Sequence, residues 1–195
     1  MKKISKGVIA LIVVGVLAVW MAFSYNGMVS KEESVTTEWS NVQTQYQRRS
    51  DLIPNLVNTV KGYAQHESQT LENLVAARSK ATQLTVDADD LTPEKMKQIQ
   101  AAQGELTSAL GKLLAITENY PDLKANQNFS ELQAQLEGTE NRIAESRRKY
   151  NESVKAFNIS IRRFPNNIVA GLFGFEKKTT FEADEAAQQA PTVNF

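Results

Sequence analysis

The stretch RRSDLIPNLV, residues 48–57, decides how the chain is expected to fold. Apolar residues recur every three or four positions on both sides of it, which predicts one helix leading in and another leading out. Asp51 has a side chain suited to a helix N-cap, and proline is tolerated in a first helical turn. The stretch therefore predicts that the chain reverses direction at Asp51–Pro54.

Upstream of this stretch, the sequence predicts a membrane anchor within residues 1–29. Residues 7–30 carry no charge and residues 8–23 are almost wholly apolar, against the roughly 20 apolar residues that cross a bilayer core. Lysines at positions 2, 3 and 6 precede the run, which favours a cytoplasmic N-terminus and a protein body on the outer side of the membrane. A cleaved signal peptide, cut near Ala22-Phe23-Ser24, is the alternative.

Downstream, apolar periodicity and cap residues predict helices over about 31–50, 52–83, 93–119 and 129–164. Short connections join them, and almost no strand pattern occurs. We therefore expect an all-α fold, with an N-terminal transmembrane helix followed by an antiparallel up-and-down four-helix bundle over residues 30–165. A coiled-coil dimer is the alternative, but the turns favour pairing within one chain. An apolar segment at 166–182 and a flexible tail at 183–195 complete the expected organisation.

Helix order predicts which connections share an end of the bundle. If the first helix leaves the membrane, Asp51–Pro54 and the loop at 120–128 lie at the distal end, roughly 45 Å away for a thirty-residue helix. The linker at 85–92 and the segment after Phe164 then lie near the membrane. We expect the distal tip to present a charged set to a protein partner: Arg48, Arg49, Asp51, Asp122 and Lys124.

The segment after the last predicted helix is a candidate contact with the bilayer surface. Its apolar side chains are Ile168, Leu172, Phe173 and Phe175, and Lys177 and Lys178 follow them. An interfacial segment would bury the apolar residues at the acyl boundary and leave the lysines among the headgroups. The alternative interpretation is a segment that packs against the base of the bundle.

Composition and motifs argue against most catalytic and metal chemistries. The 22 basic and 22 acidic side chains balance, so no general basic field attracts nucleic acid, and no cysteine is present. His66-Glu67 begins like a helical zinc motif, but Thr70 stands where the second histidine is required. We expect no metal, no cofactor and no catalytic residue. An enzyme site between helices around His66, Glu67 and Arg78 remains the alternative.

Several polar side chains lie in or beside the apolar stripes of the predicted helices: Arg49, Arg78, Glu140, Arg147, Asn151 and Asn158. An unpaired buried charge costs several kcal/mol, on the order of 3–5 when a buried partner is missing. These side chains must therefore find partners. We interpret them as a structural network that fixes helix register, in preference to a polar binding groove.

Ordered motifs along the chain resemble the LemA family of bacterial membrane-associated proteins. The matching segments are residues 48–57, 60–67, 76–78, 120–126, 129 with 132–133, 140–143, 147–151, 158, 164–165 and 170–175. The resemblance covers roughly residues 25–182 and implies an N-terminal transmembrane helix with an antiparallel helical-bundle domain. It supplies no reaction and no catalytic residue.

The sequence as a whole predicts a membrane-anchored helical-bundle scaffold or interaction protein of the bacterial envelope, without catalytic activity. Its expected partners are the membrane and a protein that the sequence does not identify, and homo-oligomerisation stays open. A lipid-interacting envelope protein is the second alternative, beside the enzyme with an inter-helix site.

Overall fold

The computed structural model describes residues 5–64 and 66–182, and all regular secondary structure in this part of the chain is helical, without a strand. The expectation of an all-α protein is confirmed. The tail predicted at 183–195 lies outside the described residues. The elements in chain order are α1 Lys6–Lys61, α2 Ser68–Gln83, the short 3-10 helix η1 Ala88–Asp90, α3 Pro93–Thr117, α4 Pro121–Lys124, α5 Gln127–Arg162 and α6 Asn166–Phe173.

Helix α1 is a single helix of 56 residues that joins the apolar N-terminal segment to the body of the protein. The predicted reversal at Asp51–Pro54 is wrong, because α1 continues through Pro54 to Lys61, and the predicted boundary at residue 30 falls inside this helix. Proline lacks the N–H that would bond to the carbonyl four residues earlier. The Nε of Arg78 on α2 donates to that carbonyl of Ser50, at 2.8 Å, so the helix continues without a buried unpaired acceptor.

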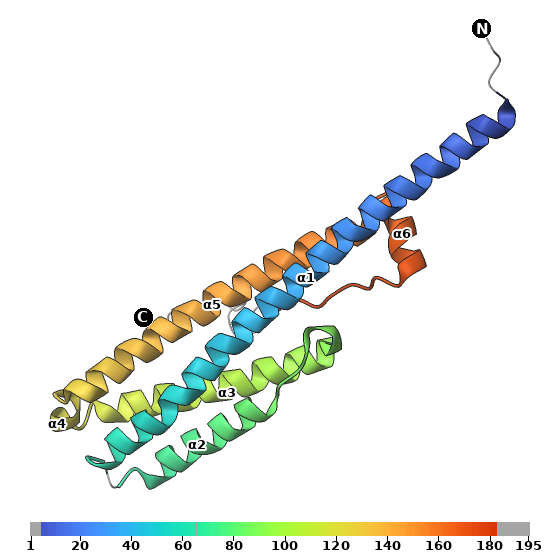
Figure 1. Ribbon diagram of the computed structural model, residues 1–195. Helices are drawn as coiled ribbons and strands as arrows, with labels where there is room; N and C mark the ends of the chain where they lie inside the picture. The colour runs from blue at the N-terminus through green and yellow to red at the C-terminus, as the bar shows by residue number, and fades with distance from the viewer. Residues whose placement is uncertain (1–4, 65, 183–195) are drawn as a thin grey trace, which may run out of the picture.

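Helices α1 and α5 lie side by side in opposite directions and form a long rod (Figure 1). The α2–α3 hairpin covers only the half of the rod that is distant from the N-terminus (Figure 1). Because α2 has 16 residues, it returns only about 24 Å along α1. The linker after α2 is fixed midway, where Trp39 Nε1 and Gln43 Nε2 donate to the carbonyl of Val86 at 2.8 and 2.9 Å. The linker also reaches Lys178 through Asp89, and the position of residues 85–92 near the membrane stays a prediction.

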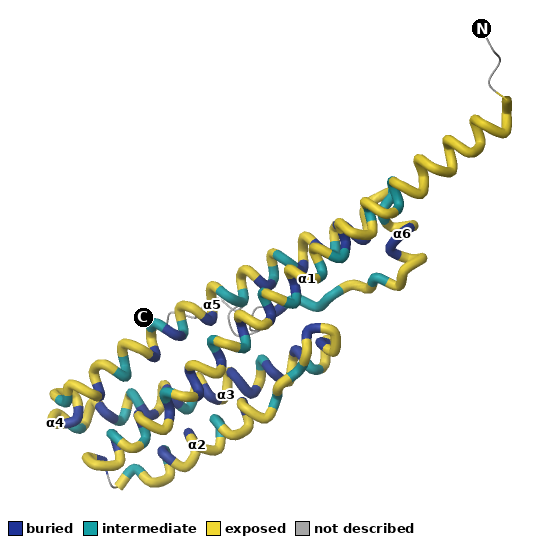
Figure 2. The backbone as a smooth tube through the Cα atoms, in the orientation of Figure 1, coloured by how far each residue is buried: buried dark blue, intermediate teal, exposed yellow. Residues whose placement is uncertain are grey.

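Two apolar cores follow one another along the rod. The distal core joins α1, α2, α3 and α5 through residues such as Ile53, Leu74, Leu106 and Phe129. The second core joins α1, α5 and α6 with the linker and includes Trp39, Tyr150, Phe157 and Val169. Figure 2 shows buried positions along this paired region and an exposed first part of α1. That part contains, within the described chain, the one segment long and apolar enough to cross a membrane, and none of it is buried.

After α6 the chain turns at Gly174, whose positive φ of 75° suits a residue without a side chain, and runs back along α5. We call residues 175–182 the strap. Asn158 donates to the carbonyl of Lys178 at 2.9 Å and accepts from its N–H at 3.0 Å. Asn151 bonds Phe181 in the same two ways, at 3.1 and 2.9 Å. Seven helical residues rise about 10.5 Å and three extended residues about 10 Å, so the two pairs of bonds match in spacing.

Candidate functional site

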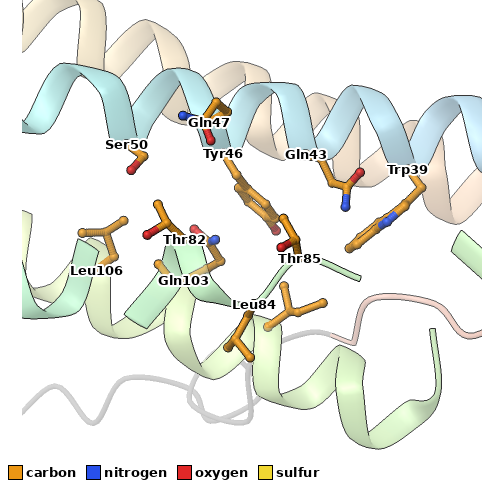
Figure 3. Close-up of a pocket in the computed structure, with 12 residues that line it drawn as sticks. Trp39, Gln43, Tyr46, Gln47, Ser50, Thr82, Leu84, Thr85, Gln103 and Leu106 are labelled. Atoms are coloured by element: carbon orange, nitrogen blue, oxygen red, sulfur yellow. The ribbon is translucent and has the colours of Figure 1, made fainter. Parts of the chain in front are cut away.

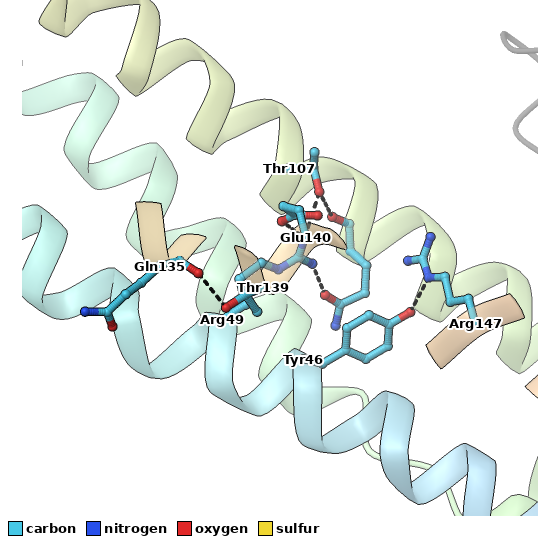
Figure 4. A network of polar contacts seen from close by, with 8 residues as sticks. Tyr46, Arg49, Thr107, Gln135, Thr139, Glu140 and Arg147 are labelled. Carbon is cyan, nitrogen blue, oxygen red and sulfur yellow. Dashed lines mark hydrogen bonds and ion pairs between the residues drawn. The ribbon is translucent and has the colours of Figure 1, made fainter. Parts of the chain in front are cut away.

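A buried polar network connects three helices in the middle of the rod (Figure 4). Arg49 on α1 is only 1% exposed. Its Nη1 donates to Thr107 Oγ1 at 2.9 Å and to Glu140 Oε1 at 2.5 Å, while its Nη2 donates to the side-chain carbonyl of Gln103. The carboxylate of Glu140 supplies the countercharge that a buried guanidinium needs. Arg49 therefore fixes the register of α1, α3 and α5, and it is not available to a partner at the tip.

Arg147 lies beside this network and connects α5 to α1 and to the strap. Its Nε donates to the Tyr46 hydroxyl at 2.8 Å, and its guanidinium lies 5.4 Å from the Tyr46 ring centroid and 5.1 Å from that of Phe181. Burial raises the pKa of Tyr46, although the charge and hydrogen bond of Arg147 act in the opposite direction. Of the six predicted network residues, Arg49 and Glu140 pair with each other, and Arg147 contacts Arg49's neighbour Tyr46. Asn151 and Asn158 bond the strap instead, and Arg78 bonds the Ser50 carbonyl in the helical turn before Pro54.

The cavities around the network differ in size and character. A polar cleft of about 400 Å³ between α3 and α5 includes Gln103, Thr107 and Arg147 in its lining. A second cavity, lined by α1, α2, α3 and the linker between α2 and α3, measures about 50 Å³ (Figure 3), far below the roughly 300–1,000 Å³ of usual ligand pockets. Ser50 contributes to its lining, and the Ser50 hydroxyl is buried without a hydrogen-bond partner among the described residues.

The alternative enzyme site does not assemble. His66 is exposed in the turn between α1 and α2, and Glu67 accepts a hydrogen bond from the Tyr120 hydroxyl at 3.1 Å. Arg78 lies eleven residues after Glu67, about 16 Å along a helix, and faces the Ser50 carbonyl. Within residues 5–64 and 66–182, no group of three or more His, Asp or Glu side chains is arranged to hold a metal ion.

The far end of the rod consists of two turns that are bonded to each other, and we call it the distal tip: residues 62–68 without residue 65, together with residues 118–126. Asn126 Nδ2 donates to the Tyr63 hydroxyl at 3.0 Å, and Tyr120 donates to Glu67. The hydrogen bond to Glu67 raises the pKa of Tyr120. These aromatic and amide side chains were not among the residues predicted for the tip, although each lies in a motif of the family.

The five residues predicted for the tip are separated in the structure. Asp122 and Lys124 lie on α4 at the distal tip, where Lys124 pairs with Glu118 at 2.6 Å. Arg48 and Asp51 lie on α1 at least ten residues before its end, about 15 Å away. Both line a shallow surface depression with the α2–α3 linker. The separation follows from the continuation of α1 beyond Pro54.

Helix α6 is amphipathic and lies against the end of the apolar segment of α1. Its Val169 is fully buried, whereas Leu172 is 67% exposed and Ile168 and Phe173 are also exposed. The Phe173 ring centroid lies 4.8 Å from that of Tyr25 on α1. We call α6 together with Phe164, which is 78% exposed, the foot. One face of α6 packs on the rod, as in the alternative interpretation that the segment packs against the base of the bundle. Its other apolar face is exposed.

Two residues predicted for the bilayer surface pack inside the protein instead. Phe175 is half-buried, with its ring centroid 5.6 Å from that of Tyr25 and 6.2 Å from that of Phe157. Lys178 pairs with Glu32 at 2.9 Å and with Asp89 at 3.0 Å. Burial lowers the pKa of Lys178, but its bonds to the two carboxylates outweigh that effect and raise it. Lys178 thus ties the strap to α1 and to the linker.

Comparison with known families gives a match between residues 38–195 and the LemA family model. The chain belongs to the LemA family. Similar LemA-related proteins include magnetosome protein MamQ 2 of Paramagnetospirillum magneticum, which is 26% identical over 94% of this chain and 75% of the relative. Protein LemA of Metamycoplasma hominis is 27% identical over 82% of this chain and 69% of the relative. Neither name specifies a catalytic activity, so the comparisons support a LemA family protein at a membrane without naming a reaction.

Proposed function

We propose that this LemA family protein is a membrane-anchored scaffold of the bacterial envelope, held by α1 and by the foot, with the distal tip as its partner-binding surface. The observation that carries the proposal is the exposed apolar face of α6 beside Tyr25. In this proposal the distal half is an up-and-down four-helix bundle of α1, α2, α3 and α5, and the second half is the stalk.

The apolar segment of α1 and the foot place the bilayer surface at the same height along the rod. The uncharged segment begins at Gly7, and the eighteen residues from there to Ser24 rise about 27 Å, close to the thickness of a bilayer core. Tyr25 then falls at the interface, where amphipathic aromatic rings are favoured. The foot contacts the same turn of α1, so its open apolar face meets the boundary between acyl chains and headgroups.

The foot can be tested by site-directed spin labelling, because the chain contains no cysteine. We expect a label at Leu172→Cys, in the full-length protein reconstituted in phosphatidylcholine vesicles, to be accessible to oxygen and shielded from a water-soluble nickel complex. A label at Val75→Cys, an exposed apolar position on α2, is the matched control and should show the reverse. Water-like accessibility at both positions would refute the foot.

The tip can be tested by photo-crosslinking in intact cells. A crosslinking amino acid at Lys124 should capture a defined protein, whereas the same group at Arg48 should not, because Arg48 lies about 20 Å before the end of α1 at the tip. Capture of the same protein from Arg48 and not from Lys124 would move the proposed surface to the side of α1.

The proposed orientation has the N-terminus in the cytoplasm and the rod outside, and it rests on the three lysines before the span. A membrane-impermeant maleimide should therefore label Val75→Cys in intact cells without permeabilisation. Labelling that requires permeabilisation would place the rod in the cytoplasm and leave the foot and the tip unchanged.

A further inference from the structure

The foot is bordered by basic side chains that have no acidic partner within the described residues. Arg162 and Arg163 end α5 directly before Phe164, and Lys177 follows α6 in the strap. All three are exposed and none takes part in a salt bridge among residues 5–64 and 66–182. The neighbouring Lys178 is different, since Glu32 and Asp89 neutralise it.

The register of α1 and α5 gives the height of these cations above the bilayer core. Lys31 on α1 donates to Ser160 on α5 at 3.2 Å. Because the helices are antiparallel, Arg162 lies two residues closer to the membrane than Lys31, and so about 6 Å above the level of Tyr25. The headgroup layer extends roughly 5–8 Å beyond each face of the hydrocarbon core. The two guanidinium groups therefore reach the height of lipid phosphates.

We propose that the foot binds anionic lipid headgroups of the leaflet on the side of the rod, with Arg162, Arg163 and Lys177 as the headgroup-contacting residues. This inference rests on the proposed function of the foot and adds a lipid class to it. The exposed apolar face supplies insertion into any bilayer, and the unpaired cations beside it supply the preference for negative charge. Guanidinium groups can pair with headgroup phosphate oxygens in a bidentate geometry, and the net negative charge of an anionic surface adds the attraction that selects it over a zwitterionic one.

The lipid preference can be measured on the full-length protein in vesicles of mixed phosphatidylcholine and phosphatidylglycerol. The probe is spin-labelled phosphatidylglycerol, compared with spin-labelled phosphatidylcholine, and the readout is the fraction of each that is motionally restricted by the protein. A basic residue near an anionic surface contributes about 1 kcal/mol, or roughly fivefold in association. We expect R162Q/R163Q/K177Q to reduce the relative association of the anionic lipid about tenfold or more.

The matched control is R48Q/K97Q/K112Q, which removes the same charge from exposed positions on α1 and α3 that lie away from the foot. It should keep the preference, and the N-terminal lysines are common to every variant. Retention of the preference by R162Q/R163Q/K177Q, or an equal loss in the control, would overturn the lipid assignment.

The depth of the Leu172 label separates this inference from the proposed function. If the label is immersed in phosphatidylcholine vesicles but R162Q/R163Q/K177Q binds phosphatidylglycerol as the wild type does, the membrane contact of the foot is supported and the proposed role of the three cations is refuted. If the label is immersed and the triple variant loses the preference, both stand. A label that is never immersed overturns both.

Discussion

Arg48 and Arg49 are adjacent in sequence and have opposite environments. Arg49 lies three residues after Tyr46 and four before Ile53, so the helical repeat puts it on the buried face of α1. Arg48 points about 100° away and is exposed. The sequence therefore predicts a partnered Arg49, and its partner Glu140 was in the predicted network. Its other partners, Gln103 and Thr107, carry no charge to distinguish them from surface residues.

Arg49→Lys tests the geometry of the network. A lysine keeps the positive charge but lacks the planar fork that reaches Thr107, Glu140 and Gln103 together. We expect the free energy of unfolding in detergent to fall by about 2 kcal/mol, the scale of two lost charge-assisted hydrogen bonds. Arg48→Lys is the control and should change it by less than about 0.5 kcal/mol. Equal effects would show that the network does not stabilise the fold.

Tyr150 predicts a loss of stability in alkaline solution. Burial raises the pKa of Tyr150 to about 12, whereas an unfolded tyrosine titrates near 10. The neutral side chain is the one that fits the core, so its contribution is complete below about pH 10 and is lost as the pH rises to about 12. We expect a decrease on the order of 2 kcal/mol in the free energy of unfolding across this window.

The comparison with Tyr150→Phe isolates this effect from lysine titration in the same range. The variant loses the hydrogen bond from Tyr150 to the Thr179 carbonyl, 2.8 Å in length, and should be less stable at neutral pH. Its stability should then decline less steeply between about pH 10 and 12. Parallel pH curves for the two proteins would contradict the assignment to Tyr150. Tyr46, whose pKa is also raised by burial, accounts for a residual slope.

At the scale of elements, α1 shows why local signals can place a helix boundary wrongly. Asp51 and Pro54 have the composition of a helix start, and that pattern predicted a reversal. The acceptor that Pro54 leaves unpaired is satisfied by Arg78, 28 residues further along the chain from Ser50. A contact of this kind depends on tertiary packing, which the local pattern does not contain. By contrast, α3 and α5 at Pro93–Thr117 and Gln127–Arg162 begin at cap residues whose bonds are local.

A double-mutant cycle measures the link between Pro54 and Arg78. In Pro54→Ala the new N–H can bond to the Ser50 carbonyl, so the loss of Arg78 should cost less than in the wild-type background. We expect a coupling free energy of about 1 kcal/mol between Pro54→Ala and Arg78→Ala. Lys80→Ala, which breaks only a surface pair with Glu105, should show no coupling. Additive effects of the first pair would indicate that Arg78 has another role.

The strap depends on two side-chain amides that the sequence showed only as polar residues on a predicted helix. We expect N151A/N158A to increase the hydrogen-exchange rates of the Lys178 and Phe181 amides about fivefold or more, because each loses its acceptor on α5. Exchange of residues in α3 should not change. Asn141→Ala, an exposed position on α5, is the control, and equal acceleration by it would show that the strap is held by its apolar contacts alone.

At the scale of the whole molecule, the protein is a rod with a short hairpin on its distal half (Figure 1). The sequence predicted helices and an anchor, but it predicted a second helix, over residues 52–83, long enough to return along the whole of a first helix over residues 31–50. The actual lengths, 56 residues in α1 and 16 in α2, displace the linker to the middle. Because α2 is much shorter than α1, the α2–α3 hairpin ends at the distal tip on one side and stops short of the foot on the other. The exposed face of α6 was predicted from its apolar residues, whereas its packing on Tyr25 required the three-dimensional register.

In the proposed arrangement, the foot fixes the angle between the rod and the bilayer. From Tyr25 to Lys61, α1 rises about 54 Å, so neutron reflectometry of the protein in a supported bilayer should give a protein layer close to that thickness. We expect L172S/F173S to thin the layer, because a rod held by α1 alone tilts freely. Val75→Ser, on the exposed surface of α2, is the control. An unchanged layer in L172S/F173S would mean that the foot does not set the angle.

The two asparagine pairs also act as a ruler that links the lengths of two parts of the chain. Asn151 and Asn158 mark one heptad of α5, and Lys178 and Phe181 mark three residues of the strap. An insertion of one residue between Asn151 and Asn158, or between Lys178 and Phe181, would move one asparagine out of reach of its backbone partner. Seven residues added to α5 together with three added to the strap would lengthen both by about 10 Å and keep both pairs of bonds. Evolutionary change in the length of this region is therefore expected to be coupled, with seven residues gained or lost on one side for every three on the other.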